Sequence, residues 1–87
     1  MEETKVIKVL LLSSQEIVVS EIEEIAAEFG DPNCKLINPY LFISIDDMKP
    51  WKSDITNQIE FMIRSEDILT IADPTGAVAD RYIELTA

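Results

Sequence analysis

Apolar residues gather in short runs along the chain, and polar or turn-forming segments separate them. The runs in residues 5–12, 35–45, 59–63 and 68–71 are rich in β-branched side chains, which predicts strands. Asn38-Pro39 interrupts the second run, and a proline inside a strand pattern predicts a bend, a bulge or an edge position.

Residues 16–29 fit two structures. Val18, Ile22, Ile25, Ala26 and Phe29 have the spacing of one helical face. Ser13 with Glu16 has the form of a capping box before such a helix, and Gly30 stands where it would end. The β-branched run Ile17-Val18-Val19 favours a strand instead, entered through a turn at Ser13-Ser14. The pattern alone leaves both alternatives open.

The C-terminal residues 77–85 are also ambiguous. Val78, Tyr82 and Leu85 lie at i, i+4 and i+7, which predicts a short terminal helix, although another strand is the alternative.

Residues 59–71 predict two strands joined by a tight polar turn, Arg64-Ser65-Glu66-Asp67. From Phe61 to Ile71 this segment resembles the second signature of the Sm and Sm-like proteins, in which a strand ends in Ile-Arg-Gly, turns and returns. Ser65 stands where that family has glycine.

A partial match to the first Sm signature lies upstream. A strand, a turn and a second strand fit within residues 9–22, and Asn33 with Leu36 matches the family's Asn-x-x-Leu. Ser14 or Gln15, Ser20 and Ser65 replace the family's glycines. The aromatic residue that the family has two positions before the Asn is absent.

The resemblance implies one Sm-like domain over residues 1–87, a small, strongly bent five-stranded open barrel. An α/β sandwich with an amphipathic helix at 16–29 is the alternative fold. Family members pair edge strands into rings and bind single-stranded RNA at the pore. Carried over, the resemblance makes Asn33, Arg64 and Ser65, together with Asp31, the expected contacts to RNA or DNA.

Charge limits the mode of binding. The chain has 7 basic and 17 acidic residues in 87, a net charge of −10. Nucleic-acid binding draws much of its free energy from Lys and Arg against phosphates. We therefore expect weak, salt-dependent binding confined to the pore of a homo-oligomeric ring. The alternative function is an acidic interaction or scaffold module with a basic protein partner.

Catalysis and membrane insertion are not expected. The chain has no histidine and one cysteine, Cys34, and no pairing of nucleophile and base is evident. The sequence therefore predicts a non-enzymatic protein without cofactor or metal. No apolar run reaches the roughly 20 residues of a membrane span, and the lone cysteine fits a reducing compartment, so we expect a cytoplasmic protein.

Overall fold

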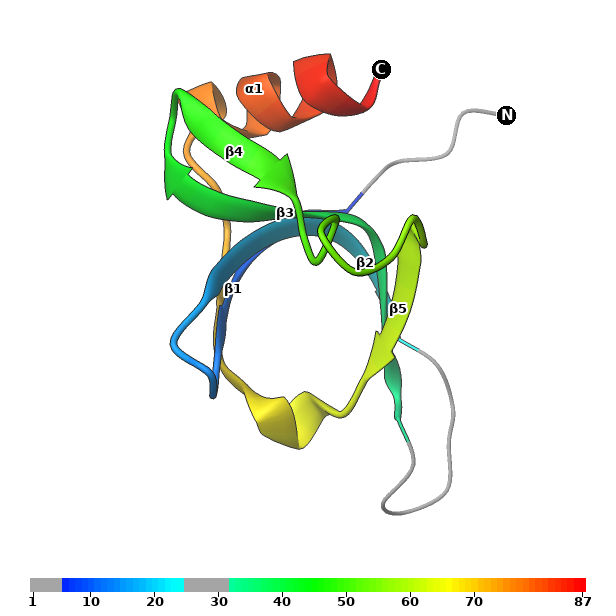
Figure 1. Ribbon diagram of the computed structural model, residues 1–87. Helices are drawn as coiled ribbons and strands as arrows, with labels where there is room; N and C mark the ends of the chain where they lie inside the picture. Colours follow the sequence, from blue (N-terminus) through cyan, green and yellow to red (C-terminus); the bar gives the residue numbers. More distant parts are fainter. Residues whose placement is uncertain (1–5, 25–31) are drawn as a thin grey trace, which may run out of the picture.

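A strongly curved antiparallel sheet carries helix α1 on its outer side (Figure 1). The computed structural model describes residues 6–24 and 32–87. The elements in chain order are β1 (Ile7–Leu12), β2 (Ile17–Glu24), β3 (Cys34–Ser44), β4 (Asp47–Pro50), β5 (Glu60–Ile63), the 3-10 turn η1 (Ser65–Asp67), β6 (Ile68–Ala72) and α1 (Gly76–Thr86). The strand order is β4-β3-β2-β1-β6, and β5 also pairs with β3.

The β1–β2 hairpin fixes which side chains face inward. Leu10 pairs with Val18, and Val9 pairs with Val19. Because successive side chains on a strand point to opposite faces, Leu10 and Val18 enter the core while Val9 and Val19 face outward. Gln15 adopts φ 76° in the turn.

Strand β3 changes its partner at the Asn38-Pro39 interruption. Residues 34–37 pair with β5, whereas residues from Tyr40 onward pair with β4. Proline has no N–H to donate, so it fits the gap between the two partners. The Pro39 carbonyl still accepts a hydrogen bond from the Trp51 amide at 2.9 Å.

The core lies inside the curve of the sheet. Its buried members are Leu10, Leu12, Val18, Cys34 and Leu36. Partly buried side chains pack around them, namely Ile22, Trp51, Phe61, Ile63 and Ile68. Contributions from β1, β2, β3, β5 and β6 make this core dependent on pairings distant in sequence.

Helix α1 packs on the outer face through Tyr82. Thr75 caps the helix by accepting a hydrogen bond from the Val78 amide at 3.3 Å. Tyr82 is 2% exposed, and its ring meets that of Tyr40 edge-on with centroids 5.9 Å apart. The outer face of the sheet is therefore apolar where the helix covers it.

These observations confirm a mainly β fold, with a bent, open sheet and a C-terminal helix. The strand count of five is wrong, because residues 47–50 pair with β3 as a sixth strand. Of the two alternatives for residues 16–29, the helix is wrong for residues 17–24, which form the strand β2; residues 25–29 lie outside the described part. No helix of the described residues is long and apolar enough to cross a membrane.

Candidate functional site

The turn between β5 and β6 is held from two sides. Arg64 leaves β5 in an extended conformation and its carbonyl accepts a hydrogen bond from the Asp67 amide at 3.0 Å. The Asp67 carbonyl accepts from the Ser13 amide, in the β1–β2 turn, at 2.8 Å. On the other side, the Asn33 amide donates to the Ile63 carbonyl at 3.2 Å.

The Asn33 side chain fastens this turn to the start of β3. Its Oδ1 accepts from the Ser65 amide at 2.9 Å, and its Nδ2 donates to Ser65 Oγ at 3.2 Å. Two of the expected site residues, 32 positions apart in the sequence, are thus joined to each other. Because both Asn33 side-chain atoms already bond Ser65, Asn33 positions the turn.

Arg64 supplies the cationic group of this turn. Its guanidinium Nε lies 3.5 Å from Asp67 Oδ2, and each side chain is 48% exposed. An exposed pair of this kind is weak, roughly 0–1 kcal/mol, so the guanidinium remains accessible to another anion. Asp31, the remaining expected contact, lies outside the described residues.

A cavity of about 310 Å³ adjoins the turn, lined by Ile22, Glu24, Asn33, Cys34, Ser65, Ile68 and Ile71. Burial raises the pKa of the Cys34 thiol, and the Glu24 carboxylate raises it further. A thiol with a raised pKa is a poor nucleophile at neutral pH. Within residues 6–24 and 32–87 no cluster of three or more His, Cys, Asp or Glu side chains could hold a metal ion.

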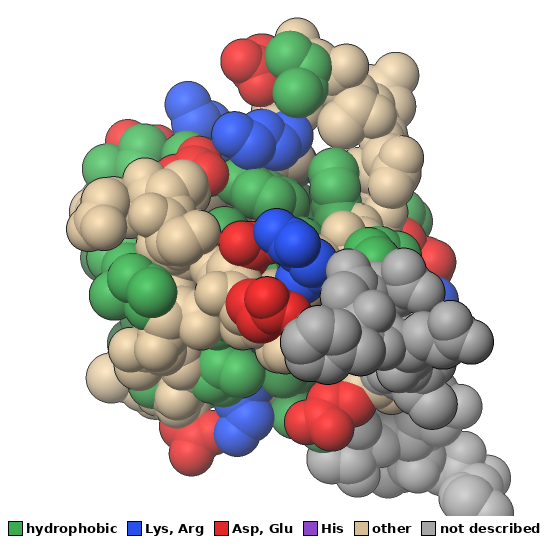
Figure 2. All heavy atoms as spheres, turned by 90° about the horizontal axis from the view of Figure 1, so that it is seen from below, with side chains coloured by type: hydrophobic (Ala, Val, Ile, Leu, Met, Phe, Trp, Pro, Cys, Tyr) green, Lys and Arg blue, Asp and Glu red, His purple; other side chains and the backbone are tan. Residues whose placement is uncertain are grey.

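The cations of the described residues are mostly neutralised by neighbours. Carboxylates pair with Lys8, Lys35, Lys52, Arg64 and Arg81. Lys49 has no such partner within the described residues. Figure 2 shows basic side chains scattered beside acidic ones, without a continuous basic patch on the face in view.

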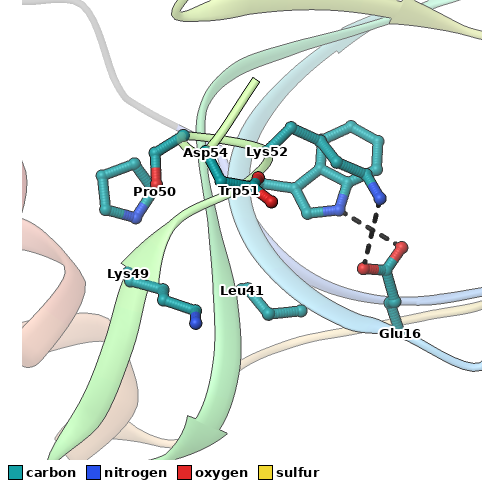
Figure 3. A pocket seen from close by; sticks show the side chains of 8 residues that line it. Glu16, Leu41, Lys49, Pro50, Trp51, Lys52 and Asp54 are labelled. Carbon is teal, nitrogen blue, oxygen red and sulfur yellow. Dashed lines mark hydrogen bonds and ion pairs between the residues drawn. The ribbon is translucent and has the colours of Figure 1, made fainter. Parts of the chain in front are cut away.

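Sequence reasoning missed a second polar cluster, beside the middle of β3 (Figure 3). Glu16 accepts a hydrogen bond from Trp51 Nε1 at 3.3 Å, and its other oxygen lies 3.6 Å from Lys52 Nζ. That ammonium also lies 5.5 Å from the centroid of the indole ring. Trp51 packs edge-on against Phe61 with centroids 5.2 Å apart.

This cluster borders the core, because Trp51 packs against it. It borders a cavity of about 230 Å³ that also includes Leu41, Lys49 and Asp54. Trp51 Nε1 and the Lys52 ammonium both have Glu16 as their partner, so the cluster is satisfied within the chain. Nothing in the sequence of residues 49–52 indicates that they contact Glu16, which is distant along the chain.

Comparison with protein families corrects the family that was predicted from the sequence. The family model that matches, over residues 5–87, is described as "Family of unknown function (DUF6561)". This match overturns the expected membership of the Sm and Sm-like family. A search of curated proteins finds no match.

Two of the side chains that stand where the Sm signature has glycine have structural roles here. Ser20 Oγ lies 2.8 Å from the Glu21 carbonyl oxygen and 3.1 Å from that of Ile37. Ser65 Oγ accepts from Asn33. Glycine could supply neither contact, which is a physical reason for the departure from that signature.

Proposed function

Since the chain belongs to DUF6561, a family of unknown function, we propose its function from its own geometry. The protein is a non-catalytic module that assembles through edge strands into a homo-oligomeric ring. The ring binds single-stranded RNA, or single-stranded DNA, at the turns that carry Arg64. The observation that carries this proposal is the pair of hydrogen bonds between Asn33 and Ser65. They hold the backbone next to Arg64 in place.

The free sheet edges of β5 and β6 support assembly. Among the described residues β5 pairs with β3 and β6 pairs with β1, which leaves one side of each strand without a strand partner. Met62 on β5 is 46% exposed, and Leu69 and Ile71 on β6 are 56% and 49% exposed. Unpaired edges with apolar side chains favour pairing with another chain. Two different edges on one chain produce a head-to-tail contact, which can close into a ring.

The position of Arg64 links assembly to binding. The turn that carries it joins β5 and β6, two of the strands that have a free edge among the described residues. A ring built through those edges would repeat the guanidinium at regular intervals, which no single subunit can do. Guanidinium groups stack on unpaired bases and bond phosphates. Because each subunit also carries excess acid, this binding is expected to be weak and sensitive to salt.

A second candidate is an acidic scaffold that binds a basic protein. The net charge of −10 and the five ion-paired cations favour it. Electrostatic complementarity would speed association with a positively charged partner.

Replacing Arg64 separates the two candidates. We expect Arg64→Ala to weaken binding of a fluorescein-labelled oligouridine by at least about tenfold, which is ~1.4 kcal/mol, in fluorescence anisotropy at low salt. Arg81→Ala is the matched control, because Arg81 also pairs with an acid three residues on, Glu84, but lies on α1.

The same titrations identify the alternative. Unchanged binding by Arg64→Ala, or equal losses in the two variants, would refute the assigned site. Binding of an oligoarginine peptide without any binding of oligouridine or oligothymidine would favour the acidic scaffold. Light scattering of each variant checks that the oligomer itself is unchanged.

A further inference from the structure

We infer that the apolar cleft beside the N-terminus of α1 receives Met62 of a neighbouring subunit. The inference rests on the proposed assembly through β5 and β6, and it names the contact that would anchor it. Met62 would project from the edge of one subunit into a site formed by another.

The cleft is nearly free of polar side chains. It has a volume of about 280 Å³, and its lining includes Val9, Val19, Phe42, Ala72, Pro74 and Val78. Asp73, the charged residue of the lining, is paired with Lys8. The cleft therefore presents an apolar surface without an uncompensated charge, which suits an apolar side chain.

The cleft lies on the outward face of the sheet at the end of β6. Leu10 and Ile71 are directly paired, and Leu10 belongs to the core. The next pair along, Val9 with Ala72, therefore faces outward, because successive side chains alternate between the two faces. Ala72 thus brings the free edge of β6 to the border of the cleft.

Met62 occupies the same face on the free edge of β5. Phe61 pairs with Leu36 of the core, so Met62, which pairs with Lys35, faces outward. All the strand pairings of the described residues are antiparallel. If β5 of a neighbour extends this ladder at β6, residues placed opposite each other share a face.

The direction of the side chains on β5 then identifies Met62 as the residue that meets the cleft. A register that keeps core-facing residues inward puts Glu60 and Met62 of the neighbour beside Thr70 and Ala72. Of that outward pair on β5, Met62 is apolar and 46% exposed. Methionine is unbranched and fills irregular apolar gaps. A projecting apolar side chain and a complementary cleft elsewhere on the same chain form a head-to-tail contact.

Disulfide trapping between subunits tests this contact. Met62→Cys chains are mixed with Ala72→Cys chains that carry a mass tag, dissociated, reassembled and oxidised. We expect a covalent heterodimer, with a 62–72 linkage identified by peptide mass spectrometry. Ile71→Cys is the matched control, because it lies next to Ala72 but faces inward, and we expect no linkage to position 62.

A charge substitution provides the second measurement. We expect Met62→Asp to lower the native mass to that of one chain, whereas Ile83→Asp, at a 50% exposed position on α1, leaves it unchanged. If the wild-type protein is an oligomer but no 62–72 linkage forms, or if Met62→Asp keeps the native mass of that oligomer, the contact between Met62 and the cleft is wrong while the proposed assembly stands. A monomeric wild-type protein would overturn both the contact between Met62 and the cleft and the proposed assembly.

Discussion

The Tyr82 hydroxyl replaces part of the backbone ladder where β2 and β3 slip out of register. The register shifts between Val19 and Glu21. The Glu21 amide donates to the hydroxyl at 3.1 Å, and the hydroxyl lies 3.0 Å from the Ile37 carbonyl oxygen and 2.9 Å from that of Asn38. The Tyr82 hydroxyl therefore provides a hydrogen-bonding partner for backbone groups at the register shift, and it attaches α1 to the sheet.

We expect Tyr82→Phe to reduce the free energy of unfolding by about 1–3 kcal/mol, because buried backbone groups lose their partner. Urea unfolding measures the loss. Tyr40→Phe is the matched control, since its hydroxyl donates only to the Leu85 carbonyl near the end of α1. Equal losses in the two variants would contradict the role assigned to Tyr82.

Alkaline pH should weaken the same contact. Burial raises the pKa of Tyr82 above its ordinary 10.0, partly offset by the Glu21 amide. Burial likewise raises the pKa of Cys34 above 9.0. A raised pKa in the folded state gives stability that is present below the unfolded pKa and lost as pH rises through the folded pKa.

The free energy of unfolding should therefore fall as pH rises above about 9 and then 10. Urea titrations between about pH 7 and 11 measure this, and Tyr82→Phe should show a smaller fall above pH 10. A flat profile for the wild-type protein across this range would contradict the account.

At the scale of elements, β3 organises the sheet because it pairs with three other strands. β2 lies along one side, and β5 and β4 share the other side on either side of Pro39. The segment between β4 and β5 is attached at its start by Trp51, whose side chain is held by Glu16. This contact should control how firmly that segment closes the core.

We expect Glu16→Ala to lower the free energy of unfolding by about 1 kcal/mol and to shift the fluorescence of Trp51, the only tryptophan of the chain, to longer wavelength. Glu16→Gln keeps an acceptor for the indole but removes the ion pair with Lys52. It should leave the emission unshifted. Wild-type emission from Glu16→Ala would show that the contact does not position Trp51.

Most elements were predictable because one run of apolar residues forms one strand. β2 was ambiguous for a physical reason. Its inward Val18 enters the core while its outward Val19 is buried as well, so the apolar/polar alternation of a strand is missing. β4 was missed because Asp-Met-Lys-Pro is polar and exposed along most of its length.

The candidate site was predictable only in part. Residue spacing cannot show that Asn33 meets Ser65, because the chain between them is long; the resemblance to a family signature only placed both among the expected nucleic-acid contacts. The family itself was predicted wrongly, which shows that this contact does not depend on membership of that family. Neither the Glu16–Trp51 contact nor the outward cleft follows from local pattern, since both join segments distant in sequence.

At the scale of the whole molecule, acidic charge and exposed apolar edges act against each other. A net charge of −10 on each chain repels neighbouring subunits, and salt screens this repulsion. Pairing the edges would bury Met62, Leu69 and Ile71, which favours assembly. Because salt weakens the repulsion but not the apolar burial, we expect the proposed oligomer to be more stable at physiological ionic strength than at low salt.

Native mass, measured by light scattering during size-exclusion chromatography at physiological salt, tests this central claim most directly. A closed head-to-tail ring predicts a single species of more than two chains, each of 9.8 kDa. A species of one chain, or a two-fold dimer, would contradict the ring and with it the repeated Arg64 site.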